Sequence, residues 1–173
     1  MQEQVLRLGA AATLLLATGS ALAQTTPQRT TATYEDWTVR CEMRGTPPVK
    51  FCEMVQAVTA PGQSNPVTQI AIGRASPKDA VKMVFQLPVN VWIATGVKFN
   101  YDPRVPPLAA PLRWCAPAGC FADLELKDDM VKRLRALTTV QGRFEFKDAG
   151  QRDVAIPVSF KGFGLAFDAL TKE

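Results

Sequence analysis

The four cysteines are the residues whose type and spacing most directly predict chemistry: Cys41, Cys52, Cys115 and Cys120. An even number of cysteines in an oxidising compartment favours two disulfides, and the sequence alone allows three connectivities. The two local pairs are favoured, because a Gly-Thr-Pro-Pro turn at 45–48 and an Ala-Pro-Ala-Gly turn at 116–119 separate their members. Two extended arms joined by such a turn bring the sulfurs within bridging distance. We therefore expect two local hairpin disulfides.

A zinc site and a dithiol redox centre are the competing interpretations of these cysteines. Structural zinc takes Cys pairs with about two to four intervening residues, a spacing that only the second pair approaches, and the chain contains no histidine. Neither pair has the Cys-x-x-Cys spacing of a redox motif. We interpret the cysteines as structural and expect no metal and no cofactor.

The absence of histidine excludes Ser-His-Asp and Cys-His nucleophiles and any imidazole ligand. No serine stands in a Gly-x-Ser-x-Gly turn, and no glycine-rich phosphate loop is present. A carboxylate-based hydrolase stays open, because four acids cluster at Asp123, Glu125, Asp128 and Asp129. Strand alternation favours an outward position for the first two, and the second two favour a helix start. We predict that the protein is not an enzyme and has no catalytic residues.

The elements that must position the cysteines are short segments rich in β-branched and aromatic residues, separated by Pro, Gly and Asn. The alternation predicts strands at 37–43, 49–58, 68–74, 81–87, 97–101, 113–115, 120–126, 142–147 and 154–160. Apolar residues at helical spacing predict helices at 128–137 and near 163–170. The expected fold is mainly β: a single antiparallel β-sandwich-like domain with one or two short packed helices.

The N-terminal residues have the layout of a signal peptide, with Arg7 before an apolar run at 8–17 and a small-residue site at 21–23. The run is shorter than the ~20 residues that span a bilayer, which disfavours a permanent anchor. We expect a signal peptide at 1–23, a flexible leader at 24–33 with little to bury, and one domain at 34–173. After cleavage no transmembrane segment is expected, so the product would be periplasmic, outer-surface associated or secreted in a Gram-negative envelope.

The net charge is +4 with a pI near 9.0, and the basic residues are scattered among nearly as many acids. No run of Lys or Arg would follow a phosphate backbone, so nucleic acid is not an expected partner. Charge alone leaves open a weak attraction to an anionic surface.

The three tryptophans and one proline-rich loop are the candidate contact residues. Trp37 and Trp114 precede cysteines, where a ring packed over a disulfide is the ordinary use, so core positions are expected for both. Trp92 lies in a loop-like segment, and a core position and a role as a contact anchor are equally favoured for it. The loop at 102–107, with Arg104 and Pro106, would either present a surface or merely cross between sheets, the second being favoured. The predicted interface residues are Trp92, Arg104 and Pro106.

Several short motifs resemble, in order along the chain, those of the invasion associated locus B family. They are Asp36-Trp37-Thr38-Val39 with Cys41; Cys52-Glu53-Met54 with Gln56; Leu87-Pro88 and Gly96-Val97; Cys115 with Gly119-Cys120-Phe121-Ala122; and Phe160-Lys161-Gly162-Phe163 with Ala166 and Leu170. One stretch departs: Pro88-Val89-Asn90 stands where the usual pattern is Leu-Pro-Leu-Gly. The resemblance implies an exported envelope protein with a β-sandwich-like core and an association with virulence, while a role as an invasin rests on analogy.

Three functional hypotheses follow from these patterns. The leading one is an exported cell-envelope binding protein of this type, whose partner is an envelope or host-surface protein. The alternative is an accessory structural subunit of a larger periplasm-facing membrane complex, which would show an apolar surface patch. The third is the carboxylate-based hydrolase. No oligomeric state is predicted.

Overall fold

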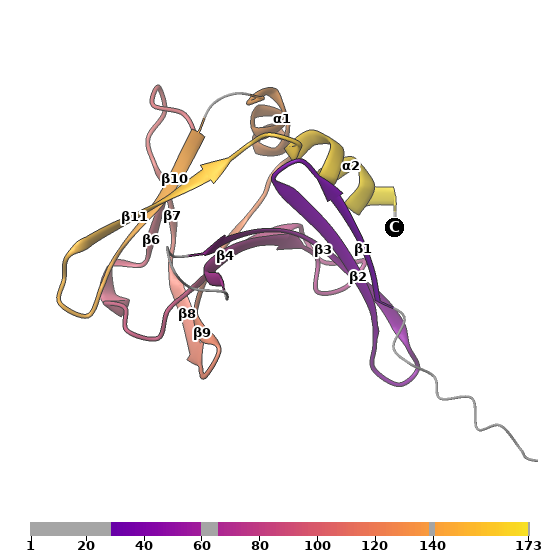
Figure 1. Cartoon of the computed structure of the whole chain (residues 1–173), viewed down its shortest axis with the longest axis horizontal. Helices are drawn as coiled ribbons and strands as arrows, with labels where there is room; N and C mark the ends of the chain where they lie inside the picture. Colours follow the sequence, from indigo (N-terminus) through magenta and orange to yellow (C-terminus); the bar gives the residue numbers. More distant parts are fainter. Residues whose placement is uncertain (1–28, 60–65, 139–140, 173) are drawn as a thin grey trace, which may run out of the picture.

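The computed structural model describes residues 29–59, 66–138 and 141–172. In these ranges two antiparallel sheets pack against each other, with two helices at one end (Figure 1). The elements are β1 (Arg29–Tyr34), β2 (Trp37–Arg44), β3 (Val49–Thr59), β4 (Pro66–Gly73), β5 (Lys82–Leu87), η1 (Ile93–Thr95), β6 (Val97–Asn100), β7 (Leu108–Ala110), β8 (Leu112–Ala116), β9 (Gly119–Glu125), α1 (Asp128–Ala136), β10 (Gln141–Lys147), β11 (Asp153–Ser159) and α2 (Phe163–Lys172).

One sheet has seven strands in the order β1-β2-β3-β4-β5-β9-β8, and the other has four in the order β11-β10-β6-β7. Strand alternation sends every second side chain inward, and aromatic rings fill the space between the layers. Phe85 on β5 lies 5.6 Å from Phe99 on β6 and 5.2 Å from Phe144 on β10, measured between ring centroids. The expected mainly β, two-layer fold is confirmed.

Both expected helices are present. α1 begins with Asp128 and Asp129, where their charges favour the helix N-terminus, and it buries Val131 and Leu134. α2 packs on β1, β2 and β3, and it also contacts α1 (Figure 1). Both helices therefore contribute side chains to the hydrophobic core.

The two disulfides join Cys41 to Cys52 and Cys115 to Cys120, which confirms the local pairing. The members of each pair face each other across a hairpin, on β2 and β3 in the first and on β8 and β9 in the second. Each bridge therefore fixes the register of two neighbouring strands.

The start of the ordered sheet corrects one expectation. Residues 29–33 were expected in a flexible leader, yet they form most of β1 and pair with β2 from Arg29↔Glu42 to Tyr34↔Trp37. The side chains of residues 29–33 are all exposed, so the sequence has no alternation of apolar and polar residues that would predict this strand. The backbone hydrogen bonds between β1 and β2 hold the strand in the sheet instead. The expected signal peptide at 1–23 and residues 24–28 lie outside the described residues, and the domain limits remain a prediction.

Candidate functional site

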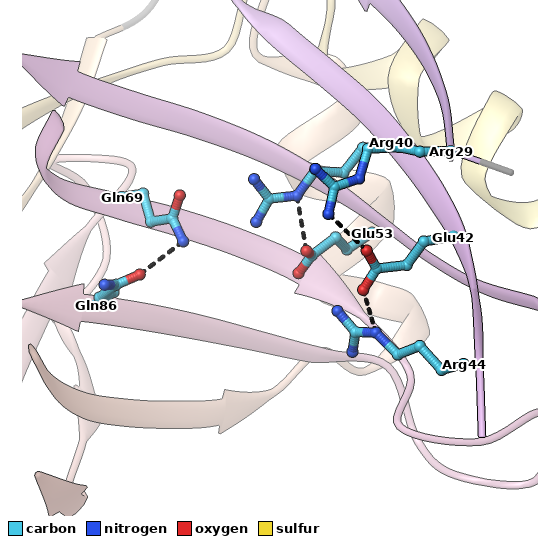
Figure 2. Close-up of polar contacts among 7 residues, drawn as sticks. All are labelled: Arg29, Arg40, Glu42, Arg44, Glu53, Gln69 and Gln86. Carbon is cyan, nitrogen blue, oxygen red and sulfur yellow. Dashed lines mark hydrogen bonds and ion pairs between the residues drawn. The ribbon is translucent and has the colours of Figure 1, made fainter. Parts of the chain in front are cut away.

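The outer face of the seven-stranded sheet carries charged and amide side chains that pair with one another (Figure 2). Glu42 on β2 accepts a hydrogen bond of 2.8 Å from Arg29 on β1, and a second from Arg44 on its own strand. The hydrogen bond from Arg29 has the largest effect in lowering the pKa of Glu42, and the bond from Arg44 has the next largest. Glu42 is thereby held as an anion between two cations.

Other polar side chains on this face also have hydrogen-bond partners on neighbouring strands. Arg40 donates a bond of 2.7 Å to Glu53 on β3, and Gln69 on β4 donates one of 2.7 Å to Gln86 on β5 (Figure 2). Most of these groups find their partners across adjacent strands, the arrangement that stabilises a solvated sheet surface. This part of the face therefore presents little unpaired charge to a ligand.

Asp123, one of the four acids behind the hydrolase hypothesis, is paired as well. Asp123 points outward from β9 as expected but is only 7% exposed, and its oxygens lie 3.6 Å from Lys82 and 3.5 Å from Arg113. Where a carboxyl pKa shift is resolved among the described residues, at Glu42, Asp102 and Asp148, it is downward. None of these three carboxyls therefore has the raised pKa that a general acid needs. Within the described ranges no cluster of three or more His, Cys, Asp or Glu could hold a metal ion.

Trp114 corrects a second expectation. It was expected in the core over a disulfide, but it is 51% exposed and stacks on Phe121, with ring centroids 5.1 Å apart. Adjacent strand residues point to opposite faces, so a ring one position before Cys115 turns away from that disulfide. Trp37, four positions before Cys41, shares its face and is fully buried as expected. An even spacing from the cysteine, as for Trp37, places the ring on the same face as the disulfide, and an odd spacing, as for Trp114, places it on the opposite face.

The crossover at 88–96 carries the chain from β5 in one sheet to β6 in the other, and Trp92 lies within it. Trp92 is 40% exposed, and its neighbours Val89 and Ile93 are 62% and 66% exposed. The backbone of the crossover is fixed, because Trp92 N–H donates to the Lys147 carbonyl at 2.8 Å and Asn90 C=O accepts from Ala149 N–H at 2.9 Å. Three large apolar side chains are therefore presented on an anchored segment.

The predicted interface residues do not form one surface. Arg104 and Pro106 are exposed in the loop after β6, whereas Trp92 lies before β6, so the strand separates the two positions. Arg104 donates two side-chain bonds to Asp102, at 2.9 and 2.8 Å, and its backbone N–H donates a third at 3.0 Å. The Arg104 guanidinium holds the pKa of Asp102 at about 2. Arg104 therefore has its partner within its own loop. Sequence reasoning missed Val89 and Ile93, although the departure of Val89 from the family pattern was a signal at that place.

Two packed antiparallel sheets and two hairpin disulfides define a disulfide-stapled β-sandwich-like domain. Residues 37–171 match the family described as invasion associated locus B (IalB) protein, and the chain belongs to this family. Two invasion protein B homologues from Brucella abortus, one in strain 2308 and one in biovar 1 strain 9-941, are each 27% identical over 143 residues. The match covers 81% of this chain and 80% of each relative.

The crystal structure of invasion associated protein B from Bartonella henselae has the same fold, with a TM-score of 0.69. It shares 21% sequence identity, and the match covers 83% of this chain and 95% of the other, so this likeness supports the fold alone. The two disulfides and the family point to an extracytoplasmic protein. In the part of the chain that the structure describes, no helix is long and apolar enough to span a membrane.

Proposed function

We propose that this chain is a non-catalytic binding protein of the extracytoplasmic space that contacts an envelope or host-surface protein through Val89, Trp92 and Ile93, the crossover patch. The exposure of these three side chains, 62%, 40% and 66%, is the observation that carries the proposal. An exposed Trp among apolar neighbours is typical of the residues that dominate protein–protein affinity. The anchored backbone lowers the ordering cost of binding.

The grouping of these residues distinguishes them from ordinary exposed apolar side chains. Single exposed hydrophobic residues are normal on a protein surface, and Met43 and Leu165 are of this kind. The crossover places three within five consecutive positions. The names of the Brucella and Bartonella relatives associate those proteins with invasion, which makes a host-surface partner one of the two contexts that we propose.

The second candidate is the accessory subunit of a membrane complex, and the same patch favours it. A subunit that stays assembled would cover Val89, Trp92 and Ile93 permanently, whereas a free binder would expose them until it meets its partner. The two functions share the contact surface and differ in the location and permanence of the partner.

Site-specific photo-crosslinking in the organism of origin tests both candidates. A benzophenone side chain replaces Ile93 in one variant and Leu165 on α2 in the control, because Leu165 is 60% exposed and lies on a helix that packs on β1, β2 and β3. Periplasm, membranes and medium are analysed separately. We expect a defined adduct at position 93 that is absent at position 165.

A second substitution connects that adduct to the patch. We expect Trp92→Ala to reduce the position-93 adduct at least about tenfold, roughly 1.4 kcal/mol, while the free energy of unfolding stays nearly constant. An adduct with a membrane-complex subunit would favour the accessory role, and one with a soluble or host protein the free binder. Identical adducts at both positions, or binding that survives Trp92→Ala with lost stability, would contradict the proposed surface.

A further inference from the structure

A groove of about 670 Å³ lies between the β2–β3 turn, the loop that joins β4 to β5, and the last turn of α2. Sites for small molecules occupy about 300–1,000 Å³, so the groove has the size of a ligand site. It is made by three segments that are distant in sequence. Its position on the seven-stranded sheet is separate from the crossover patch, which follows β5.

The walls of the groove are largely apolar. Val81 and Leu170 are partly buried and pack against the hydrophobic core, so the inner wall continues the core surface. Val49 is 53% exposed at the groove, and Phe51 and Pro77 also line it. An extended hydrocarbon could therefore bury apolar area there with a favourable free energy.

The charged side chains that line the groove are all cationic: Arg44, Lys50 and Arg74, with no Asp or Glu among its described lining residues. The Arg44 guanidinium lies 3.8 Å from the centroid of the Phe51 ring and also bonds to Glu42, which fixes its position. Arg74 follows the end of β4 and shows no ion pair with another described residue. The groove thus combines an apolar wall with positive charge.

We propose that this groove binds a free fatty acid, with the hydrocarbon chain against Val49, Val81 and Leu170 and the carboxylate beside Arg74. The charge complementarity selects an anionic head over a neutral one. The apolar walls select a chain of several methylene groups over a small anion such as acetate. This site is independent of the proposed crossover contact.

Binding of laurate to the disulfide-formed, ¹⁵N-labelled protein tests the inference by NMR, at laurate concentrations below its micelle-forming range. We expect saturable shifts of amides in the groove, such as those of Val81, Leu170 and Thr171. Dodecanol has the same chain without the charge, and we expect its affinity to be at least about threefold lower. Acetate is expected to produce no saturable shift in these amides.

Two pairs of matched substitutions locate the site. Val49→Asp places a carboxylate in the wall and is expected to weaken laurate binding at least about fivefold, while Leu165→Asp, at a 60% exposed position of α2 outside the groove lining, leaves it unchanged. Arg74→Gln is expected to weaken binding by about two- to fivefold, and Lys161→Gln, at an exposed cation outside the groove lining, to have no effect. Both groove substitutions lie at accessible positions, so folding should be retained.

Each contrary result overturns the inference. No saturable laurate shift would remove the site, and shifts centred on Val89 and Trp92 would move it to the crossover patch. Equal affinity for dodecanol would remove the role of the cations. Binding to phosphatidylglycerol vesicles without saturable laurate binding would replace the groove by a membrane surface.

Discussion

The indole N–H of Trp37 donates a hydrogen bond of 2.9 Å to the backbone carbonyl of Ser159. Trp37 opens β2 in the seven-stranded sheet and Ser159 closes β11 in the four-stranded sheet, so this bond joins the two layers. The same carbonyl accepts a bond of 3.0 Å from the side chain of Gln56, whose oxygen accepts the Ser159 N–H at 2.8 Å. The Trp37 ring meets Phe163 of α2 edge-on, with centroids 5.3 Å apart. A buried polar and aromatic contact therefore holds the sheets and α2 together at this end.

Replacement of Trp37 by Phe should remove the donor while keeping most of the buried ring. We expect the free energy of unfolding to fall by about 1–2 kcal/mol, from the lost hydrogen bond and incomplete filling of the site. Trp114→Phe is the control at an exposed ring, with an expected change within about 0.5 kcal/mol. Urea unfolding followed by circular dichroism measures both. Equal effects of the two substitutions would mean that the interlayer bond adds no stability.

Gly162 lies between β11 and α2 with a φ of +75°, a conformation that residues with a side chain rarely adopt. A Cβ atom there would lie 2.0 Å from the carbonyl oxygen of Tyr34. We expect Gly162→Ala to lower the free energy of unfolding by at least about 3 kcal/mol. Gly164→Ala is the matched control two residues away, inside α2 with nothing within 4 Å, and should stabilise by about 0.4–1 kcal/mol. Thermal unfolding of both variants checks the opposite signs, and a tolerated alanine at 162 would contradict the close approach.

The two disulfides should differ in their contribution to stability, because they close loops of 11 and 5 residues. Loop-closure entropy predicts a loss of about 3 kcal/mol for the double variant Cys41→Ala and Cys52→Ala. The same relation predicts about 2 kcal/mol for Cys115→Ala and Cys120→Ala. Denaturant unfolding of the two double variants gives the comparison. Non-reducing peptide mass spectrometry tests the pairing itself. A peptide pair linked by a disulfide between Cys41 and Cys115 would contradict the two local disulfides.

Much of the fold could be predicted from the sequence, because burial leaves a pattern. Strands such as β4 and β5 alternate buried and partly buried residues, and α1 places Val131 and Leu134 on one stripe. β1 left no such pattern, since the side chains of residues 29–33 are exposed and backbone pairing alone defines the strand. Periodicity therefore reports strands that bury a face and misses an exposed edge.

The candidate contact surfaces were less predictable, because they depend on which segments meet in space. Trp92 is 40% exposed on a crossover whose backbone bonds to Lys147, a contact between distant segments that no local sequence pattern contains. The groove joins Val49, Val81 and Leu170 from three distant segments. Trp114 is a different case, because its odd spacing from Cys115 already contradicted a position over the disulfide.

The loop after β6 makes a prediction about pH, because Arg104 holds the pKa of Asp102 at about 2. A folded-state pKa below the ordinary Asp value of about 3.9 means that the contribution to stability is present above that value. It is lost as the pH falls toward 2. Carbon-13 NMR titration should place the Asp102 midpoint near 2 in the native chain and closer to the ordinary value in Arg104→Gln.

A second pair in the chain supplies the control for this titration. Arg152 lowers the pKa of Asp148 in the same manner, so Arg152→Gln should raise the midpoint of Asp148 and leave that of Asp102 unchanged. The Arg104 side chain is 83% exposed, so we expect added salt to weaken the pairing and raise the Asp102 midpoint. An Asp102 midpoint that stays low in Arg104→Gln would show that the backbone N–H of residue 104, rather than the guanidinium, holds the carboxylate.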